Sequence, residues 1–223
     1  AAVVLPPRDA MLTPEPAATV QQLSGNRLLM GVASGDRPVE YPLFGRDFPG
    51  RGANFRSQVD LLRDHARAHL PEPLDLLPRP SAPLPLLVAG LSQQTPAWIG
   101  QHMDGSLAFP GTPEEHARRV AAWRAVAGAK PYASFIHMEL DAHPNAPMRR
   151  WRFGFTGGRN ALIAELHAMR AAGVDHIGLH VRRNQRPLEE TFHEIAEYVL
   201  PLFHSQPAAD RAPNAALLEI AGA

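Results

Sequence analysis

Short apolar runs alternate with amphipathic segments along most of the chain. Apolar runs at residues 2–5, 28–33, 86–89 and 132–140 have the length of buried strands. The segments between them repeat apolar residues every three to four positions, as helices with one buried face do. This alternation is typical of β–α units built around a mostly parallel sheet.

Helix boundaries can be read from capping and breaking residues. Thr95-Pro96 and Thr112-Pro113 each place a hydroxyl at the N-cap and a proline at the first helical position. Two helices are predicted to start at these sites. Another is expected from Phe55 through Val59 and Leu62 to Ala66, and the others are expected over 17–23, 160–172 and 187–203. Further strands are expected over 105–109 and 174–181. Leu70–Pro85 contains six prolines and is predicted to be a loop.

The number and order of these elements favour one fold class. A glycine-rich dinucleotide fingerprint does not follow the first strand, which disfavours a Rossmann domain. The pattern favours an α/β protein of the (β/α)8 TIM-barrel type, with about six of the eight strands present. The apolar start at residues 1–5 is interpreted as the end of a strand, so the first two to three strands are expected to be missing from this sequence. Residues 1–204 would form the barrel domain and 205–223 an Ala/Pro-rich tail.

Composition excludes several classes of function. The chain has 223 residues with 22 Lys and Arg against 22 Asp and Glu, which disfavours a polybasic nucleic-acid binder. It has no cysteine, which excludes disulfides, Cys-ligated metals and a thiol nucleophile and fits a cytoplasmic protein. No apolar run reaches the roughly 20 residues that a membrane span needs.

Three segments carry a resemblance to a known family. They are Leu23-Ser24-Gly25-Asn26-Arg27 with the strand and Ala33-Ser34-Gly35 that follow, Pro85–Gly90 with Ser92-Gln93-Gln94-Thr95 and Asp104-Gly105, and Ala172-Gly173-Val174-Asp175-His176 with Arg186-Pro187. In this order and spacing they resemble the bacterial luciferase-like, flavin-dependent monooxygenase superfamily, over roughly residues 1–204. Asn26 stands where that family usually has a second glycine, and the resemblance makes residues 1–5 the end of the third barrel strand.

The resemblance implies a function. It implies an oxidoreductase that uses reduced flavin (FMN) and O2 on a small organic substrate, with a flavin reductase as a partner and a homodimeric assembly. The family also contains enzymes that use the deazaflavin F420 for hydride transfer, and the sequence does not separate the two. A non-catalytic subunit or barrel fragment of the same family is a further alternative.

The same resemblance points to cofactor-binding residues. It assigns the phosphate-binding loop to Gly90 and Ser92–Thr95, with Ser92 and Thr95 as the matching hydroxyls. A loop between a strand and a helix start suits a phosphate, although Thr95 is equally explained as a plain N-cap. Ala33, Ser34 and Gly35 end another strand with small residues, so a flat ring could approach the backbone there, or the chain could simply turn. Gly158 and Arg159 precede a helix and form either an anion-binding nest or an ordinary turn and cap.

Strand alternation gives a separate set of candidates for catalysis. Ile136, Met138 and Leu140 are apolar and should face the helices, so His137, Glu139 and Asp141 should face the barrel interior or its mouth. In the same way Ile177, Leu179 and Val181 should face outward and leave His176 and His180 inward. We therefore take His137, Glu139 and His180 as candidates for acid–base work or substrate contact. The alternative is a polar network that fills the barrel, and a metal-dependent hydrolase site at His137, Glu139, Asp141 and His143 rests on this run alone.

Overall fold

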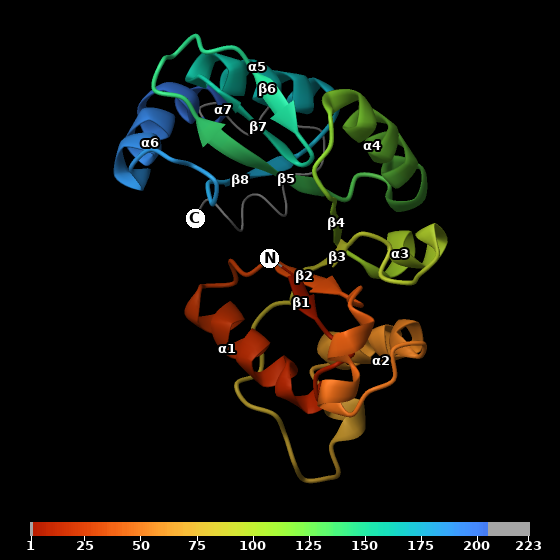
Figure 1. Ribbon diagram of the computed structural model, residues 1–223. Helices are drawn as coiled ribbons and strands as arrows, with labels where there is room; N and C mark the ends of the chain where they lie inside the picture. The colour runs from red at the N-terminus through yellow and green to blue at the C-terminus, as the bar shows by residue number, and fades with distance from the viewer. Residues whose placement is uncertain (1, 205–223) are drawn as a thin grey trace. The chain divides into compact units, whose positions relative to one another are not determined.

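A computed structural model describes residues 2–204 (Figure 1). These residues form two compact units, with the division between Leu107 and Ala108. Strands and helices alternate along both units, as the hydrophobic pattern predicts. None of the helices in this range is long and apolar enough to cross a lipid bilayer.

The first unit is a four-stranded parallel sheet with helices between its strands. Its strands are β1 (Ala2–Val4), β2 (Met30–Ala33), β3 (Leu86–Ala89) and β4 (Gly105–Leu107), hydrogen-bonded in that order, and its helices are α1 (Pro14–Leu23), α2 (Arg51–Arg63) and α3 (Pro96–His102). Val32 pairs with Val3 on one side and Val88 on the other. Val32 and Val88 are fully buried, as is Phe55 of α2.

Two helix boundaries in this unit differ from the prediction. The first helix begins at Pro14, not at residue 17, because Pro14 and Pro16 both fall in its first turn, where a missing N–H costs no helical hydrogen bond. The second ends at Arg63, so Ala66 is outside it in a left-handed conformation (φ 60°), although it is buried as predicted. Leu70–Pro85 contains no helix or strand and is the predicted loop.

The second unit is built around the long strand β5 (Tyr132–Leu140). Strand β7 (Gly154–Gly157) and strand β8 (His176–His180) both pair with β5 in parallel, and β6 (Arg149–Trp151) pairs antiparallel with β7. Its helical segments are α4 (Pro113–Ala127), α5 (Arg159–Ala171), α6 (Leu188–Glu194), a π-helical turn (Ile195–Val199) and α7 (Pro201–His204). Neither unit's sheet closes on itself within the described residues.

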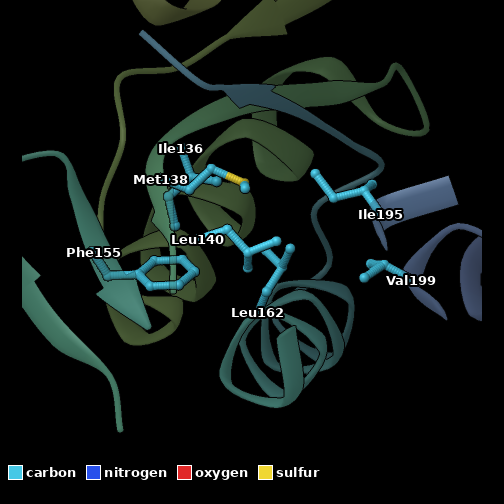
Figure 2. Close-up of a cluster of buried hydrophobic side chains, with 7 residues drawn as sticks. All are labelled: Ile136, Met138, Leu140, Phe155, Leu162, Ile195 and Val199. Atoms are coloured by element: carbon cyan, nitrogen blue, oxygen red, sulfur yellow. The ribbon is translucent and has the colours of Figure 1, made fainter. Parts of the chain in front are cut away.

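One face of the second sheet carries the core of this unit. Figure 2 shows the cluster, which consists of Ile136, Met138, Leu140, Phe155, Leu162, Ile195 and Val199. Ile177, Leu179 and Val181 pack against it. The predicted alternation of β5 and β8 is thereby confirmed, since the even positions of β5 and the odd positions of β8 meet α5 and the π-helical turn. Full burial of each aliphatic side chain contributes about 1.5–3 kcal/mol.

Two features of this unit were not predicted. The first is the β6–β7 hairpin, which adds an antiparallel strand to the sheet. The second is the interruption of the expected helix over 187–203, where Leu200 N–H donates to Ile195 C=O five residues back, at 2.9 Å. Pro201 follows at once and has no N–H of its own, which explains why the regular ladder fails here. The predicted tail at 205–223 lies outside the described residues.

Candidate functional site

The face of the second sheet opposite the core carries the polar side chains. His137 of β5 and His180 of β8 are directly paired in the ladder, and their ring centroids lie 4.2 Å apart. Glu139 is paired with Thr156 of β7, whose hydroxyl donates to the Glu139 carboxylate at 2.9 Å. The three predicted catalytic candidates therefore come together near the carboxyl ends of parallel strands, where sites in barrels of this kind lie.

The two histidines have different hydrogen-bonding states. The backbone N–H of Arg182 donates to His180 Nδ1 at 3.3 Å, so this nitrogen is unprotonated and Nε2 carries the proton of the neutral ring. Burial lowers the pKa of His137, and His180, Arg183 and Arg182 lower it further. His137 is therefore neutral at pH 7 and is able to accept a proton. Its Nδ1 is buried and has no hydrogen-bond partner among residues 2–204.

Gly154 makes the close approach of β7 to His137 possible. A Cβ atom at this position would lie 2.0 Å from the His137 carbonyl oxygen and 2.8 Å from its Cβ. The backbone N–H of His137 donates to Phe153 C=O at 3.1 Å on the same side. Only glycine permits this spacing, so Gly154 fixes His137 through its main chain.

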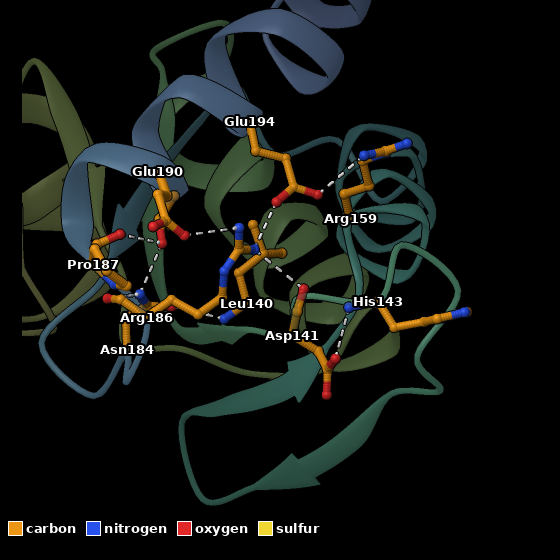
Figure 3. A network of polar contacts seen from close by, with 10 residues as sticks. Leu140, Asp141, His143, Arg159, Asn184, Arg186, Pro187, Glu190 and Glu194 are labelled. Atoms are coloured by element: carbon orange, nitrogen blue, oxygen red, sulfur yellow. Dashed lines mark hydrogen bonds and ion pairs between the residues drawn. The ribbon is translucent and has the colours of Figure 1, made fainter.

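A buried ionic network holds the ends of these elements together (Figure 3). The Glu194 carboxylate accepts from Arg186 Nη1 at 2.6 Å and from Arg159 Nη1 at 3.2 Å. Arg186 also donates to the Asp141 carbonyl at the end of β5, at 3.3 Å. Asn184 accepts from Leu140 N–H at 2.9 Å and joins the loop after β8 to the same strand end.

This network defines the environment of the predicted anion nest. The Arg159 guanidinium pairs with Glu194 and lies over the Tyr198 ring, 4.1 Å from its centroid. The Gly158 N–H donates to Ala146 C=O, and a Cβ at Gly158 would lie 2.3 Å from the Pro144 carbonyl oxygen. The guanidinium at this helix start is thus already paired with a carboxylate of the chain, which it shares with Arg186.

The predicted phosphate loop of the first unit is tightly folded. Gly90, Ser92 and Gln93 all have positive φ angles, which turns the chain sharply between β3 and α3. The Thr95 hydroxyl caps α3 by accepting from Trp98 N–H at 3.3 Å. The Gln94 side chain is buried and donates to the carbonyls of Gly52 and Ser92, each at 2.9 Å.

Ser92 joins this loop to the other predicted cofactor segment. Its hydroxyl donates to Ala89 C=O at 3.1 Å and accepts from Ser34 N–H at 3.2 Å. Ala33 ends β2, Ser34 is buried, and a Cβ at Gly35 would lie 2.7 Å from Val4 Cγ1. The structure therefore brings the Ala33–Gly35 and Gly90–Thr95 segments side by side at the carboxyl ends of β2 and β3.

The run from His137 to His143 does not form a metal-binding cluster in the part of the chain that is described. No group of three or more His, Asp or Glu side chains within residues 2–204 could hold a metal ion. Asp141 instead accepts from the backbone N–H of His143 at 2.8 Å, in a local turn.

A fully buried histidine in α4 leads to a prediction about pH. His116 of α4 is fully buried against the Tyr132 hydroxyl (3.0 Å), and burial is the main cause that lowers its pKa, with Arg119 adding to it. As the pH falls, His116 is therefore protonated in the unfolded chain before it is protonated in the folded one. The stability that depends on neutral His116 is fully present above about pH 6.5 and is lost as the pH falls toward the folded-state pKa. We expect the free energy of unfolding to fall by up to about 1.4 kcal/mol per pH unit for this group, measured by urea unfolding between pH 7 and pH 5. His116→Gln should flatten this slope while His176→Gln, at an exposed site, leaves it unchanged; equal slopes in all three proteins would contradict the assignment.

Comparison with known families identifies the chain. The family model described as luciferase-like monooxygenase matches residues 1–137, and the chain belongs to this family. The third motif of the sequence resemblance lies beyond the matched range. The uncharacterized protein Rv0940c of Mycobacterium tuberculosis is 28% identical over 127 residues, which cover 52% of this chain and 43% of that protein. The chain thus spans less than half of the length of this curated relative.

Solved structures extend the likeness to the fold of most of the chain. The match to the monooxygenase RslO1 from Streptomyces bottropensis has 18% identity and a TM-score of 0.71, and it covers 91% of this chain and 77% of RslO1. The match to EDTA monooxygenase (EmoA) from Chelativorans sp. BNC1 has 12% identity and a TM-score of 0.67, and it covers 96% of this chain and 75% of EmoA. The match to the coenzyme F420-dependent tetrahydromethanopterin reductase from Methanopyrus kandleri has 12% identity and a TM-score of 0.66, and it covers 88% of this chain and 80% of the reductase. These structures confirm the predicted α/β class of TIM-barrel type, and the sheet of residues 2–204 is open, as in part of such a barrel.

Sequence reasoning missed the site residues contributed by β7 and the loop after β8. Thr156, Gly154 and Arg182 all contact a predicted candidate or its backbone. The local pattern gave no signal for β7, because the apolar residues at every second position do not belong to one strand. Trp151 ends β6, Phe153 lies in the turn and only Phe155 is in β7.

Proposed function

We propose that this chain forms the catalytic face of a luciferase-like oxidoreductase that acts on a small organic substrate with a reduced flavin or deazaflavin. The observation that carries the proposal is the polar face of β5, β7 and β8, where His137, Glu139 and His180 meet at strand ends in a chain of this family. A neutral, partly buried histidine beside a second one that presents Nε2–H is suited to proton transfer at a reacting molecule.

The roles of the three side chains follow from their contacts. His137 accepts a proton, since its lowered pKa keeps it neutral at pH 7. His180 donates from Nε2, because its Nδ1 is held by the Arg182 N–H. Glu139 is oriented by the Thr156 hydroxyl and would contact the substrate. A bound reduced flavin would supply the electrons of the reaction, and a separate flavin reductase is the expected source of reduced FMN.

The segments that would hold the cofactor fit a phosphate group only in part. The Gly90–Thr95 loop is small and polar, but the Ser92 hydroxyl already joins Ala89 to Ser34. Ser92 would therefore shape the loop, and Thr95, at the start of α3, is the hydroxyl nearest to the helix N–H groups. FMN would be held here through its phosphate, whereas F420 is the cofactor named for the reductase from Methanopyrus kandleri.

The phosphate assignment is tested with two variants that preserve the helix cap. Asp and Asn both accept the Trp98 N–H as N-caps, so Thr95→Asp and Thr95→Asn should fold like the wild type. The added carboxylate of Thr95→Asp would repel a phosphate within a few ångströms, and we expect it to weaken FMN binding at least about tenfold. Binding is measured by flavin fluorescence during titration, with melting temperature as the folding control.

Riboflavin, which lacks the phosphate, provides the matched comparison. Its affinity should be the same for Thr95→Asp and Thr95→Asn, because no phosphate is present to be repelled. Equal FMN affinity for the two variants would refute the assignment of this loop to the phosphate.

A further inference from the structure

A cavity of about 290 Å³ lies in the second unit, between the start of α4 and the β6–β7 hairpin. One wall is the start of α4 and the loop before it, with Gly111, Glu115 and Arg119. The other wall is the β6–β7 hairpin, and Ile136 of β5 also lines the cavity. Its volume is close to the lower end, about 300 Å³, of the range for small-molecule sites.

Four residues of the hairpin line this cavity, two of them cationic and two aromatic: Arg150, Trp151, Arg152 and Phe153. The Arg152 guanidinium lies over the Phe153 ring, 4.9 Å from its centroid. An aromatic wall beside guanidinium groups suits a ligand that is flat on one side and anionic on the other.

The guanidinium groups around the cavity differ in their partners. Glu165 is almost fully buried and binds Arg150 through both of its oxygens, one of them at 2.9 Å, and Glu114 also helps to raise the pKa of Arg150. Arg119 lies 3.8 Å from Glu115 and donates to Phe109 C=O at 2.8 Å. Arg152 makes no ion pair within residues 2–204. Its guanidinium is therefore the one available to the carboxylate of a ligand.

We propose that this cavity binds a small aromatic carboxylate, with its carboxylate on Arg152 and Arg119 and its ring against Trp151 and Phe153. A bidentate guanidinium–carboxylate contact supplies both energy and orientation. Gly111 leaves room for the side chains of Glu115 and Arg119 in the cavity wall, because a Cβ there would lie 2.6 Å from Glu115 Oε2 and 2.9 Å from Arg119 Nη1.

The cavity is linked to the proposed catalytic face through the main chain. Phe153 C=O accepts from His137 N–H, and Gly154 lies against the His137 carbonyl. A ligand that packs on Phe153 would therefore contact the strand segment that holds His137. Binding itself needs no cofactor, so it can be measured independently of the proposed oxidoreductase activity.

The test is titration of the full chain with benzoate, followed by the fluorescence of Trp151 in a Trp98→Phe, Trp123→Phe background. We expect saturable binding, weakened at least about tenfold in Arg152→Gln. Arg149→Gln is the matched control, because Arg149 is exposed on the same hairpin and does not line the cavity. Its affinity for benzoate should stay within about twofold of the parent.

Uncharged benzamide separates charge recognition from ring packing, and it should bind at least about tenfold more weakly than benzoate. The proposal is overturned by the absence of saturable benzoate binding, by equal affinities for benzoate and benzamide, or by equal losses in Arg152→Gln and Arg149→Gln. Circular dichroism melting of each variant confirms that it is folded. Loss of FMN binding in any of these variants would concern the proposed oxidoreductase function. It would leave the proposal that the cavity binds an aromatic carboxylate unchanged.

Discussion

Replacing Glu194 with alanine is expected to lower the free energy of unfolding by about 3–5 kcal/mol. The Glu194 side chain is only 10% exposed and holds two guanidinium groups, those of Arg186 and Arg159. Removing it leaves both cations partly buried without their carboxylate, which is the most costly way to break an ion pair of this kind. Urea unfolding of the variant and the wild type at pH 7 measures the effect.

Glu190 provides the matched control for this experiment. It is on the same helix and also pairs with Arg186, but at 3.9 Å and with 62% of its side chain exposed. Exposed pairs contribute about 0–1 kcal/mol, so Glu190→Ala should be nearly neutral. If Glu194→Ala and Glu190→Ala cost the same, the network does not hold the strand ends as described.

Replacing His137 with glutamine is expected to reduce turnover about 100- to 10,000-fold, the usual range for loss of a general acid or base. Glutamine keeps a polar side chain of similar size but cannot accept and release a proton at neutral pH. The measurement is the rate at which enzyme-bound reduced flavin is reoxidised, followed by the return of its visible absorption. Flavin affinity is measured in parallel, and it should remain within about threefold.

His176 is the control for this second prediction. It lies on the same strand as His180 and on the same face, but it is exposed and makes no contact with His137. His176→Gln should therefore retain the wild-type rate. A similar loss of rate in both variants would show that the effect is general to this face of the sheet, and a wild-type rate in His137→Gln would remove His137 from the mechanism.

It could be predicted that the His137 and His180 side chains lie on the inward face, because the face of a strand residue depends only on local periodicity. A period of two assigns each residue of β5 and β8 to one face, and both strands carry apolar residues on the other face. Their relative register was not predicted, since it is set by packing of Ile177 and Leu179 on the shared core.

The contacts that the sequence left open are those between distant segments. Ser92 was predicted to bind a ligand, yet its hydroxyl contacts Ser34, 58 positions away in the chain. The partners of Arg159 are similarly remote, because Glu194 is 35 residues further along. Nothing in the local pattern around either residue separates an internal partner from a ligand, so such roles depend on the tertiary structure.

The π-helical turn shows the same limit for secondary structure. The apolar positions of 187–203 follow a helical period, and most of this segment is helical. The break at Ile195–Val199 depends on how Pro201 and the buried Val199 are accommodated against the core. Periodicity predicts the element, and packing determines where its ladder is interrupted.

Cofactor binding by the wild-type chain tests the central claim most directly. The full-length protein is titrated with FMN, F420 and riboflavin, and bound cofactor is followed by fluorescence and by the rise in melting temperature. We expect saturable binding of FMN or F420, with riboflavin weaker than FMN if FMN is the cofactor. Failure to bind either cofactor would contradict a flavin- or deazaflavin-dependent function for this chain.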